Sequence, residues 1–327
     1  MQFSDFDKTT QVILKVILAG LILALLWWVR DIIILLIMAL ILASAMEPLV
    51  DYFHVKKVPR VLSVVIVYIV VIGVAGLIVY LMIPPVVEQF KILLANLPQY
   101  TQVLDSKFGS SYVQSFFQNL VSGFDTGNVV QGTFGIFNGA LDAIAVLVIS
   151  FYLVAEQQGM KVFIGSLVPP AQQEFTLQLI SKIQHKMGMW VIGQVIISLG
   201  IFLFTYIGLL ILHVQYALVL ALVAGLLEIV PYIGPFLSAI PAMFIAFIQS
   251  PPLTIWVAVL YIFVHEFEGY VLVPKIMEKT VGQSPLLTLI ALLIGYQLAG
   301  IIGLIISVPL ATALTVIVNE VWPGKSR

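Results

Sequence analysis

Two groups of ionisable side chains lie in stretches that are otherwise apolar. The first is Glu228, which interrupts the apolar run 216–248 and is followed by a Pro-Tyr-Ile-Gly-Pro segment at 231–235. A carboxyl group at membrane depth costs free energy unless a cation, a proton or a hydrogen-bond donor accompanies it. Two interpretations of Glu228 are open. It is either a cation or proton site or polar substrate anchor, or a carboxyl that hydrogen-bonds backbone N–H groups freed at the break.

The second group is His265, Glu266 and Glu268, the densest set of ionisable residues in an apolar stretch. On a helix, residues three apart share a face, so His265 and Glu268 are expected to lie together while Glu266 points elsewhere. An imidazole beside a carboxylate can accept and pass a proton. The alternative is a position at the cytoplasmic end of a span, shortly before Pro274, where these side chains reach water.

The segment around the first glutamate is too interrupted to form one membrane span. Proline lacks an N–H and clashes with the preceding helical turn, while Gly234 permits unusual φ values. The pieces 217–230 and 235–249 are each short for a hydrocarbon core of ~30 Å, at ~1.5 Å per helical residue. The stretch 285–318 is too long for one span and has a Gly-rich midpoint, 299–303. We therefore predict two helical hairpins. The residues expected to shape their breaks are Pro231, Tyr232, Gly234, Pro235, Pro241, Gly295, Gly303 and Pro309.

The composition sets the fold class. Hydrophobic residues make up 61% of the 327 residues and charged residues 9%, and the mean hydropathy is +1.12. Several uncharged stretches approach the ~20 residues that a helix needs to span a bilayer. We predict an all-α integral membrane protein, a multi-pass helical bundle whose two hairpins of broken helices belong to an inverted repeat.

Several other classes of chemistry find no support in the sequence. There is no cysteine, so a thiolate nucleophile, a disulfide and a Cys-based metal site are excluded. The net charge of −1 gives no indication of a nucleic-acid partner. Phosphate-binding loops, H-E-x-x-H and nucleophile–base arrangements are missing. We expect a protein that is not an enzyme and has no metal or cofactor, apart from a coupling ion, Na⁺ or H⁺.

Breakers and polar stretches divide the chain into parts. Ordinary spans are predicted at 11–29, 32–50, 61–83, 141–155 and 190–212. The expected units are a three-span N-terminal scaffold at 1–83, an external amphipathic helical region at 84–139, a fourth span with a cytoplasmic amphipathic helix (172–187) at 140–189, and a transport core at 190–327. This core would hold two span-plus-hairpin units, 190–250 and 253–318.

Lysine and arginine in short loops predict the orientation, because such loops stay on the cytoplasmic side. With a cytoplasmic N-terminus, only Arg30, Lys91 and Lys107 of the 15 cations fall outside. This places Arg30 between two oppositely directed spans and both termini in the cytoplasm, in the inner membrane of a cell. Polar side chains within or beside spans, expected to line a path or to bond between helices, are Gln194, Gln297 and Asn138.

The C-terminal half looks duplicated. Ala221 to Gly225 precedes Gly234 and an Ile-Pro pair, and 291–295 precedes Gly303 and a Val-Pro pair. Spans rich in Leu, Ile and Gly also resemble each other by chance. In the predicted orientation the two hairpins enter from opposite sides, so the units are inverted. Inverted repeats with broken helices meeting near the midplane are a recurrent design of secondary transporters.

Two motifs in this half carry a family resemblance. An E-x-x-P-Y-x-G-P element spans 228–235, and an E-x-x-x-L-x-P element spans 268–274 and precedes a Pro- and Gly-rich span ending in Val-Pro. The chain resembles the autoinducer-2 exporter family over nearly its whole length. One departure is Gln283-Ser284, where many members have Leu-His. The matching residues are Glu228, Pro231, Tyr232, Gly234, Pro235, Pro241, Glu268, Leu272, Pro274, Pro285, Gly295, Gly303 and Pro309.

The resemblance implies a multi-spanning transport protein that assembles as a homo-oligomer. Some members are linked to export of autoinducer-2 and others to exchange of sodium or lithium for protons. We expect a secondary transporter that exports a small polar molecule by alternating access, with Glu228 and Glu268 in its core. A sodium(lithium)/proton antiporter and a non-transporting membrane scaffold are the alternatives. The expected partners are a small molecule or cation, the lipid bilayer and further copies of the chain.

Overall fold

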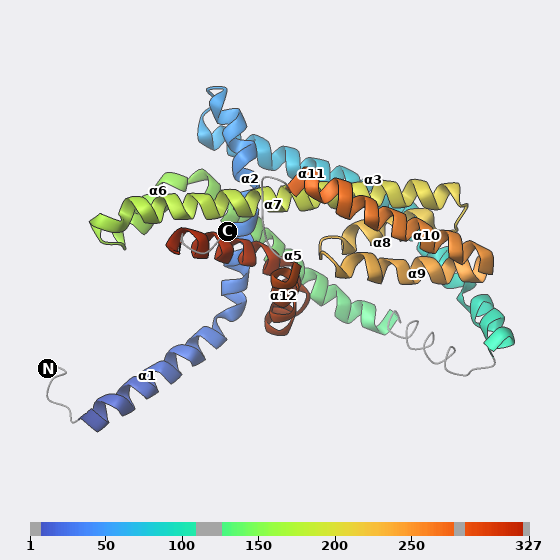
Figure 1. Cartoon of the computed structure of the whole chain (residues 1–327), viewed down its shortest axis with the longest axis horizontal. Coiled ribbons are helices and arrows are strands. Elements are labelled where there is room, and N and C mark those ends of the chain that lie inside the picture. Colours follow the sequence, from blue (N-terminus) through green and yellow to red (C-terminus); the bar gives the residue numbers. More distant parts are fainter. Residues whose placement is uncertain (1–7, 109–125, 278–284, 323–327) are drawn as a thin grey trace.

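The computed structural model describes residues 8–108, 126–277 and 285–322, and these are almost wholly helical (Figure 1). The helices are α1 (Lys8–Trp28), α2 (Arg30–Val55), α3 (Arg60–Phe108), α5 (Thr126–Ala155), α6 (Gln157–Ser166), α7 (Pro170–Ile211), α8 (Ala217–Leu227), α9 (Ile233–Gln249), α10 (Pro251–Phe267), the π-helical η2 (Glu268–Leu272), α11 (Val273–Met277) and α12 (Pro285–Val321). Within the described ranges, five helical stretches are long and apolar enough to cross a membrane. The predicted all-α, multi-pass class is confirmed, and the inverted repeat stays a prediction.

The first two helices form a bent line and do not fold back on each other. Only Val29 separates α1 from α2, and helical hydrogen bonds continue through it, from Val29 N to Leu25 O and from Ile33 N to Val29 O, both 3.0 Å. Figure 1 shows α1 pointing away from the bundle at the end of α2. A reversal needs a loop of about 2–5 residues. The oppositely directed pair of spans expected around Arg30 is therefore wrong.

Two further helices run through boundaries expected from the sequence. α3 continues past residue 83, and α7 unites the predicted surface helix 172–187 with the span 190–212. In α7 the only weak point between these pieces is Gly188, and a lone glycine costs a helix only ~1 kcal/mol. A β-carbon at Gly188 would overlap the backbone carbonyl of Ser44, so the glycine lets α2 and α7 cross closely. α5 likewise runs across residue 139. The division into functional units stays a prediction.

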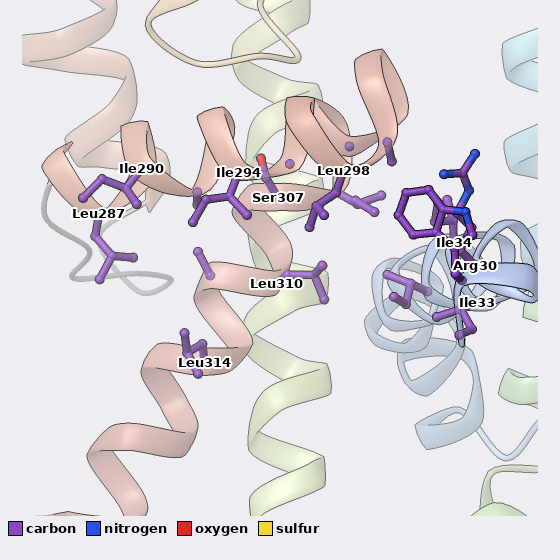
Figure 2. A pocket seen from close by; sticks show the side chains of 18 residues that line it. Arg30, Ile33, Ile34, Leu287, Ile290, Ile294, Leu298, Ser307, Leu310 and Leu314 are labelled. Atoms are coloured by element: carbon purple, nitrogen blue, oxygen red, sulfur yellow. The ribbon is translucent and has the colours of Figure 1, made fainter. Parts of the chain in front are cut away.

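α12 is a hairpin, as its length predicted (Figure 2). Ala299 (φ −142°, ψ 20°) and Gly300 (φ 59°, ψ −136°) leave the helical region and separate two arms. The positive φ favours glycine, which has no β-carbon to clash. Gly295 and Gly303 face each other across the arms, and a β-carbon on either would overlap the backbone of the other.

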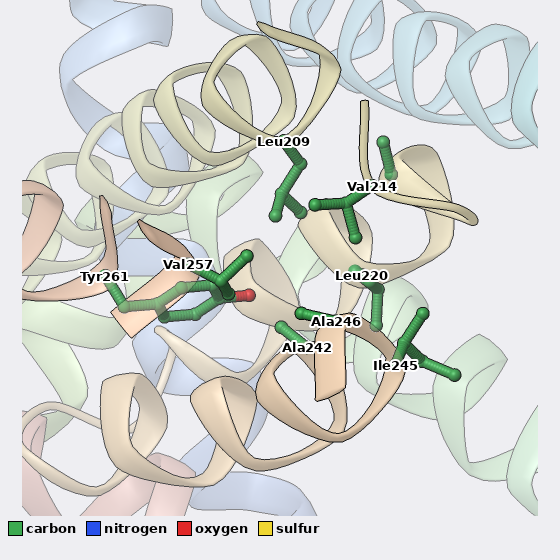
Figure 3. Close-up of a cluster of buried hydrophobic side chains, with 9 residues drawn as sticks. Leu209, Val214, Leu220, Ala242, Ile245, Ala246, Val257 and Tyr261 are labelled. Carbon is green, nitrogen blue, oxygen red and sulfur yellow. The ribbon is translucent and has the colours of Figure 1, made fainter. Parts of the chain in front are cut away.

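The other hairpin consists of α8 and α9, which pack with α7 and α10 around a buried apolar cluster (Figure 3). Leu209, Leu220, Ile245 and Val257 each come from a different one of these four helices. At the open end, the Gln249 side chain joins the arms, because its Nε2 donates to His213 O (2.8 Å) and its Oε1 accepts from Gln215 N (3.1 Å). These contacts fix the arms and hence the position of their tip.

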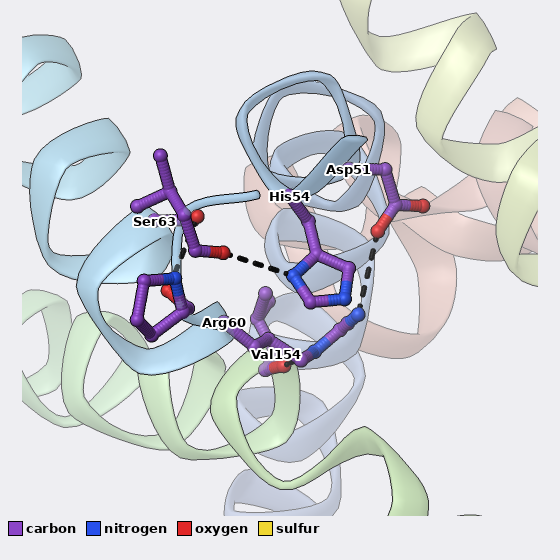
Figure 4. Close-up of polar contacts among 7 residues, drawn as sticks. Asp51, His54, Arg60, Ser63 and Val154 are labelled. Atoms are coloured by element: carbon purple, nitrogen blue, oxygen red, sulfur yellow. Dashed lines mark hydrogen bonds and ion pairs between the residues drawn. The ribbon is translucent and has the colours of Figure 1, made fainter. Parts of the chain in front are cut away.

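A polar corner fixes the opposite part of the molecule, where α2, α3 and α5 meet (Figure 4). Arg60 Nε donates to the Val154 carbonyl (3.1 Å), and Arg60 Nη1 contacts Asp51 Oδ1 (3.3 Å). His54 Nδ1 lies 3.1 Å from the carbonyl oxygen of Val58. One cation thus ties three helices together at this end.

Candidate carboxylate site at the hairpin tip

The tip between α8 and α9 is closed by local backbone hydrogen bonds. Val230 N donates to Leu227 O (3.0 Å), and Gly234 N donates to Val230 O (3.0 Å). Pro231 has no N–H to satisfy, and Tyr232 takes the positive φ of 65°. The carbonyl of Glu228 accepts a hydrogen bond from Gln194 Nε2 of α7. A broken backbone inside a membrane needs such partners.

Glu228 directly follows the last residue of α8, and its side chain is fully buried (0% exposed). Neither carboxyl oxygen has a hydrogen-bond partner among the described residues. The second interpretation of Glu228 is a carboxyl group that hydrogen-bonds backbone N–H groups at the break. The structure does not show such bonds within the described ranges, so the carboxyl group does not cap the break. An ionised carboxylate in such surroundings is costly unless another charge or a donor reaches it.

Glu268 is the ionisable group that acts electrostatically on Glu228. It is 8% exposed and begins η2, the π-helical turn that follows α10. Turns of this type interrupt α-helices frequently at functional sites. His265 Nδ1 lies 3.3 Å from Glu268 Oε2, while Glu266 is exposed on another face. The shared face of His265 and Glu268 is confirmed, and burial of Glu268 contradicts the expectation that it reaches water.

Helices α7 and α8 pack closely beside Glu228. A β-carbon at Gly225 of α8 would lie 2.8 Å from Phe202 Cβ on α7, so these helices touch without space for water. Trp190 of α7 packs in one cluster with Val230 at the first tip and Val308 of α12. The two hairpins therefore meet at α7, next to the carboxyl pair.

This arrangement can bind and release a proton or a monovalent cation. Two carboxyl groups in dry surroundings repel each other when both are charged, so one proton or cation between them lowers the free energy. The nearby imidazole can exchange a proton with Glu268.

The profile of a family described as "AI-2E family transporter" matches residues 16–322 of this chain. The match covers nearly the whole sequence. The chain belongs to the AI-2E family. Membership and the apolar helices together make it a multi-pass membrane transport protein acting on a small-molecule substrate.

Several curated transport proteins are similar in sequence to this chain over most of their length. "Putative transport protein YrrI" of Bacillus subtilis (strain 168) is 26% identical over 309 residues, which cover 88% of this chain and 86% of the relative. "Putative transport protein YhhT" of Escherichia coli (strain K12) is 27% identical over 342 residues, covering 100% and 95%. "AI-2 transport protein TqsA" of the same strain is 26% identical over 333 residues, covering 95% and 93%.

The structure places the predicted break residues of this AI-2E protein at different points. Pro231 and Tyr232 form the first tip. Gly234 has no positive φ, contrary to expectation; its β-carbon would overlap the backbone of Leu227, so close approach of the arms requires the glycine. Pro241 lies inside α9 and Pro309 inside α12, away from the tips. Neither shapes a break, because neighbouring helices and side chains let a membrane helix continue through proline.

Of the remaining residues predicted at the breaks, Pro235 lies in the first turn of α9, and Gly295 and Gly303 pack together beside the second tip. The predicted polar lining residues do not gather in one place. Gln194 bonds the first tip, Gln297 is exposed near the second tip, and Asn138 lies in α5 with a side chain outside the described part.

Three buried hydroxyl groups on α7 and α10 were missed by the sequence reasoning. Ser198 Oγ on α7, and Thr254 Oγ1 and Tyr261 Oη on α10, have no hydrogen-bond partner within the described ranges. Thr254, Tyr261 and Glu268 recur every seven residues, which places them on one helix face. That spacing was the signal available in the sequence.

Proposed function

We propose that this AI-2E protein is a secondary transporter that exports a small polar molecule, with autoinducer-2 as the first substrate to test. We further propose that Glu228 and Glu268 form the proton-coupling site. The supporting observation is the Glu228 carboxyl, which is fully buried at a broken tip and has Glu268 as an ionisable neighbour. The name of the relative TqsA supports the choice of substrate.

In this mechanism the carboxyl pair carries a proton while the site is closed. Movement of the first tip relative to α7 opens the pair to one side of the membrane, where water stabilises the charged form and the proton leaves. Reloading on the other side completes an alternating-access cycle, as in other transporters with broken helices. His265 would pass the proton between water and Glu268, since its ring is partly exposed and contacts that carboxyl.

Exchange of sodium or lithium for protons is the second candidate function. A paired carboxyl site supports it directly, because a cation can replace the proton between the two groups. A non-transporting scaffold is the third candidate. This function does not explain why both glutamates are buried.

The deciding experiment uses purified protein reconstituted in vesicles of known internal pH. Efflux of labelled autoinducer-2 and sodium-dependent proton flux are measured separately. We expect autoinducer-2 efflux that is accompanied by proton movement in the opposite direction. Sodium-dependent proton flux without efflux would support the antiporter, and neither flux would support the scaffold.

We also propose that the protein lies in the inner membrane with the loop after α2 and the C-terminus in the cytoplasm. Because the chain has no cysteine, single cysteines can report the side of each loop. Cysteines replacing Lys57 and Lys182 should be protected from an impermeant reagent in intact cells, while one replacing His213 should react. The reverse pattern would reject this orientation.

Assembly as a homo-oligomer, which the family resemblance implies, is a further proposal. Native mass spectrometry from detergent should show more than one copy in each particle. Single copies only, in several mild detergents, would reject it.

A further inference from the structure

Two cavities meet at the tip of the second hairpin, away from the carboxylate pair. The first is an apolar groove of about 590 Å³ between the arms of α12 and the bend joining α1 to α2. Figure 2 shows Ile290, Ile294 and Leu298 following one arm towards Arg30. The groove is open to the surroundings, since Ile294 is 54% and Leu298 is 68% exposed. In a bilayer this opening faces lipid chains.

The second cavity, of about 910 Å³, lies between α2, α5 and the same tip, and it carries charges. Its lining includes Arg30, Asp31 and Asp142, together with Leu298 and Gly300. Both volumes lie in the range of about 300–1,000 Å³ that is usual for small-ligand sites. Arg30 and Leu298 line both cavities, so the apolar groove leads into the charged one.

Arg30 is held in place at this junction. Its guanidinium lies 4.5 Å from the ring centroid of Trp27, and its Nε contacts Asp31 Oδ1 at 3.3 Å. The bond to Asp31 uses one of five N–H donors, and the planar fork suits phosphate oxygens. Asp142 supplies a second carboxylate on the far wall, from α5. The cavity therefore offers one positive and two negative groups.

We propose that these joined cavities bind one phospholipid with a primary-amine head group, such as phosphatidylethanolamine. Its acyl chain lies in the groove along α12, its phosphate meets Arg30, and its ammonium group meets Asp142 and Asp31. Charge complementarity selects this head group, because a purely anionic lipid would place its extra negative charge beside two carboxylates. Trp27 at the junction suits the level of lipid head groups.

The bound lipid would join the second hairpin to the bend between α1 and α2. Across the groove, the lipid would link Ile294 and Leu310 on the arms of α12 to Ile33 of α2. Its presence would hold the hairpin in the position seen here. The site is independent of the proposed substrate and of proton coupling.

The test is native mass spectrometry of the full-length protein after delipidation and addition of phosphatidylethanolamine, phosphatidylglycerol or phosphatidylcholine. We expect phosphatidylethanolamine to bind more tightly than the other two. Arg30→Gln should weaken its binding about tenfold or more, as expected for loss of a charge-assisted contact. Asp142→Asn should remove the preference over phosphatidylglycerol. Lys15→Gln on α1 and Glu174→Gln on α7 are matched exposed controls, which should bind like the parent protein.

A groove-filling variant separates the acyl-chain contact from the head-group contact. Ile294→Trp should lower binding of all three lipids while leaving the thermal melting temperature of the protein unchanged. Equal binding of the three lipids to the parent protein, or no effect of Arg30→Gln and Ile294→Trp, would overturn the proposal. So would efficient cross-linking of Ile294→Cys to a second copy in native membranes, because the groove would then be covered by protein.

Discussion

The two hairpin tips break apolar helices in different ways. The first is closed by Pro231 and Tyr232 and carries the buried Glu228, while the second is closed by Ala299 and Gly300. The residues around the second tip, 296–302, include no carboxyl group and no basic side chain. A break between two apolar helical arms can therefore form without a carboxyl group. Closure of the backbone at the first tip therefore does not explain why Glu228 is present. This difference between the two tips supports a role for Glu228 in transport.

The strongest test of that difference is removal of the partner carboxyl. Glu268→Gln should reduce proton-coupled transport about a hundredfold, the lower range for loss of a group that transfers protons. Glu266→Gln is the control, because Glu266 lies two residues away and is exposed. This variant should keep the transport rate within about twofold of the parent protein, since surface substitutions have small effects. Rates are measured in vesicles with equal amounts of reconstituted protein. Equal losses in both variants would mean that η2 requires these glutamates for folding.

Substitution of a glycine between the arms of α12 tests how closely the arms pack at the second tip. Gly303→Ala should lower the free energy of unfolding by about 1–3 kcal/mol, because the new methyl group overlaps the Gly295 carbonyl. Gly73→Ala in α3 has free space and should be neutral or slightly stabilising. Thermal melting in detergent compares the two variants. Similar melting temperatures would show that the arms are not closely packed.

Substitution of His265 tests the proposed route of the proton to the Glu228–Glu268 pair. His265→Gln should slow transport about threefold, a small effect because the contact with Glu268 is partly exposed to solvent. The slowing should disappear in the presence of imidazole, which can replace a missing proton carrier. No rescue at any imidazole concentration would assign His265 a packing role beside Phe236.

Gln194 should have the smallest effect, and on stability only. Gln194→Leu removes the donor to the Glu228 carbonyl and should cost about 1 kcal/mol of unfolding free energy. Gln297→Leu, near the second tip and exposed, is the control and should change little. Both are followed by thermal melting. A larger loss for Gln297→Leu would show that the second tip depends on a polar contact of its own.

The sequence predicted both hairpins, because proline and chain length act locally. Pro231 removes an N–H wherever it occurs, and a stretch as long as α12 cannot fit one crossing. The pairing of His265 with Glu268 was also predictable, since both lie on one helix turn. These features depend on neighbouring residues only.

The failures concern continuity and tertiary contacts. Nothing in the sequence distinguishes a sharp turn at Val29 from the continuous bend, and Gly188 looks like a breaker until Ser44 is known to pack against it. The reason for Gly234 was missed because its requirement comes from Leu227 on the other arm. The approach of Glu228 to Glu268 depends on how α8 and α10 each pack against α7, which no local pattern encodes.

The central claim is that Glu228 carries the coupling proton. The most direct measurement compares substrate efflux by the parent protein and by Glu228→Gln, with and without a pH gradient across the vesicle membrane. The parent protein should respond to the gradient, whereas the variant, which cannot release a proton at this position, should show slow efflux that is the same in both conditions. A variant that still accelerates in the gradient as the parent protein does would contradict the account.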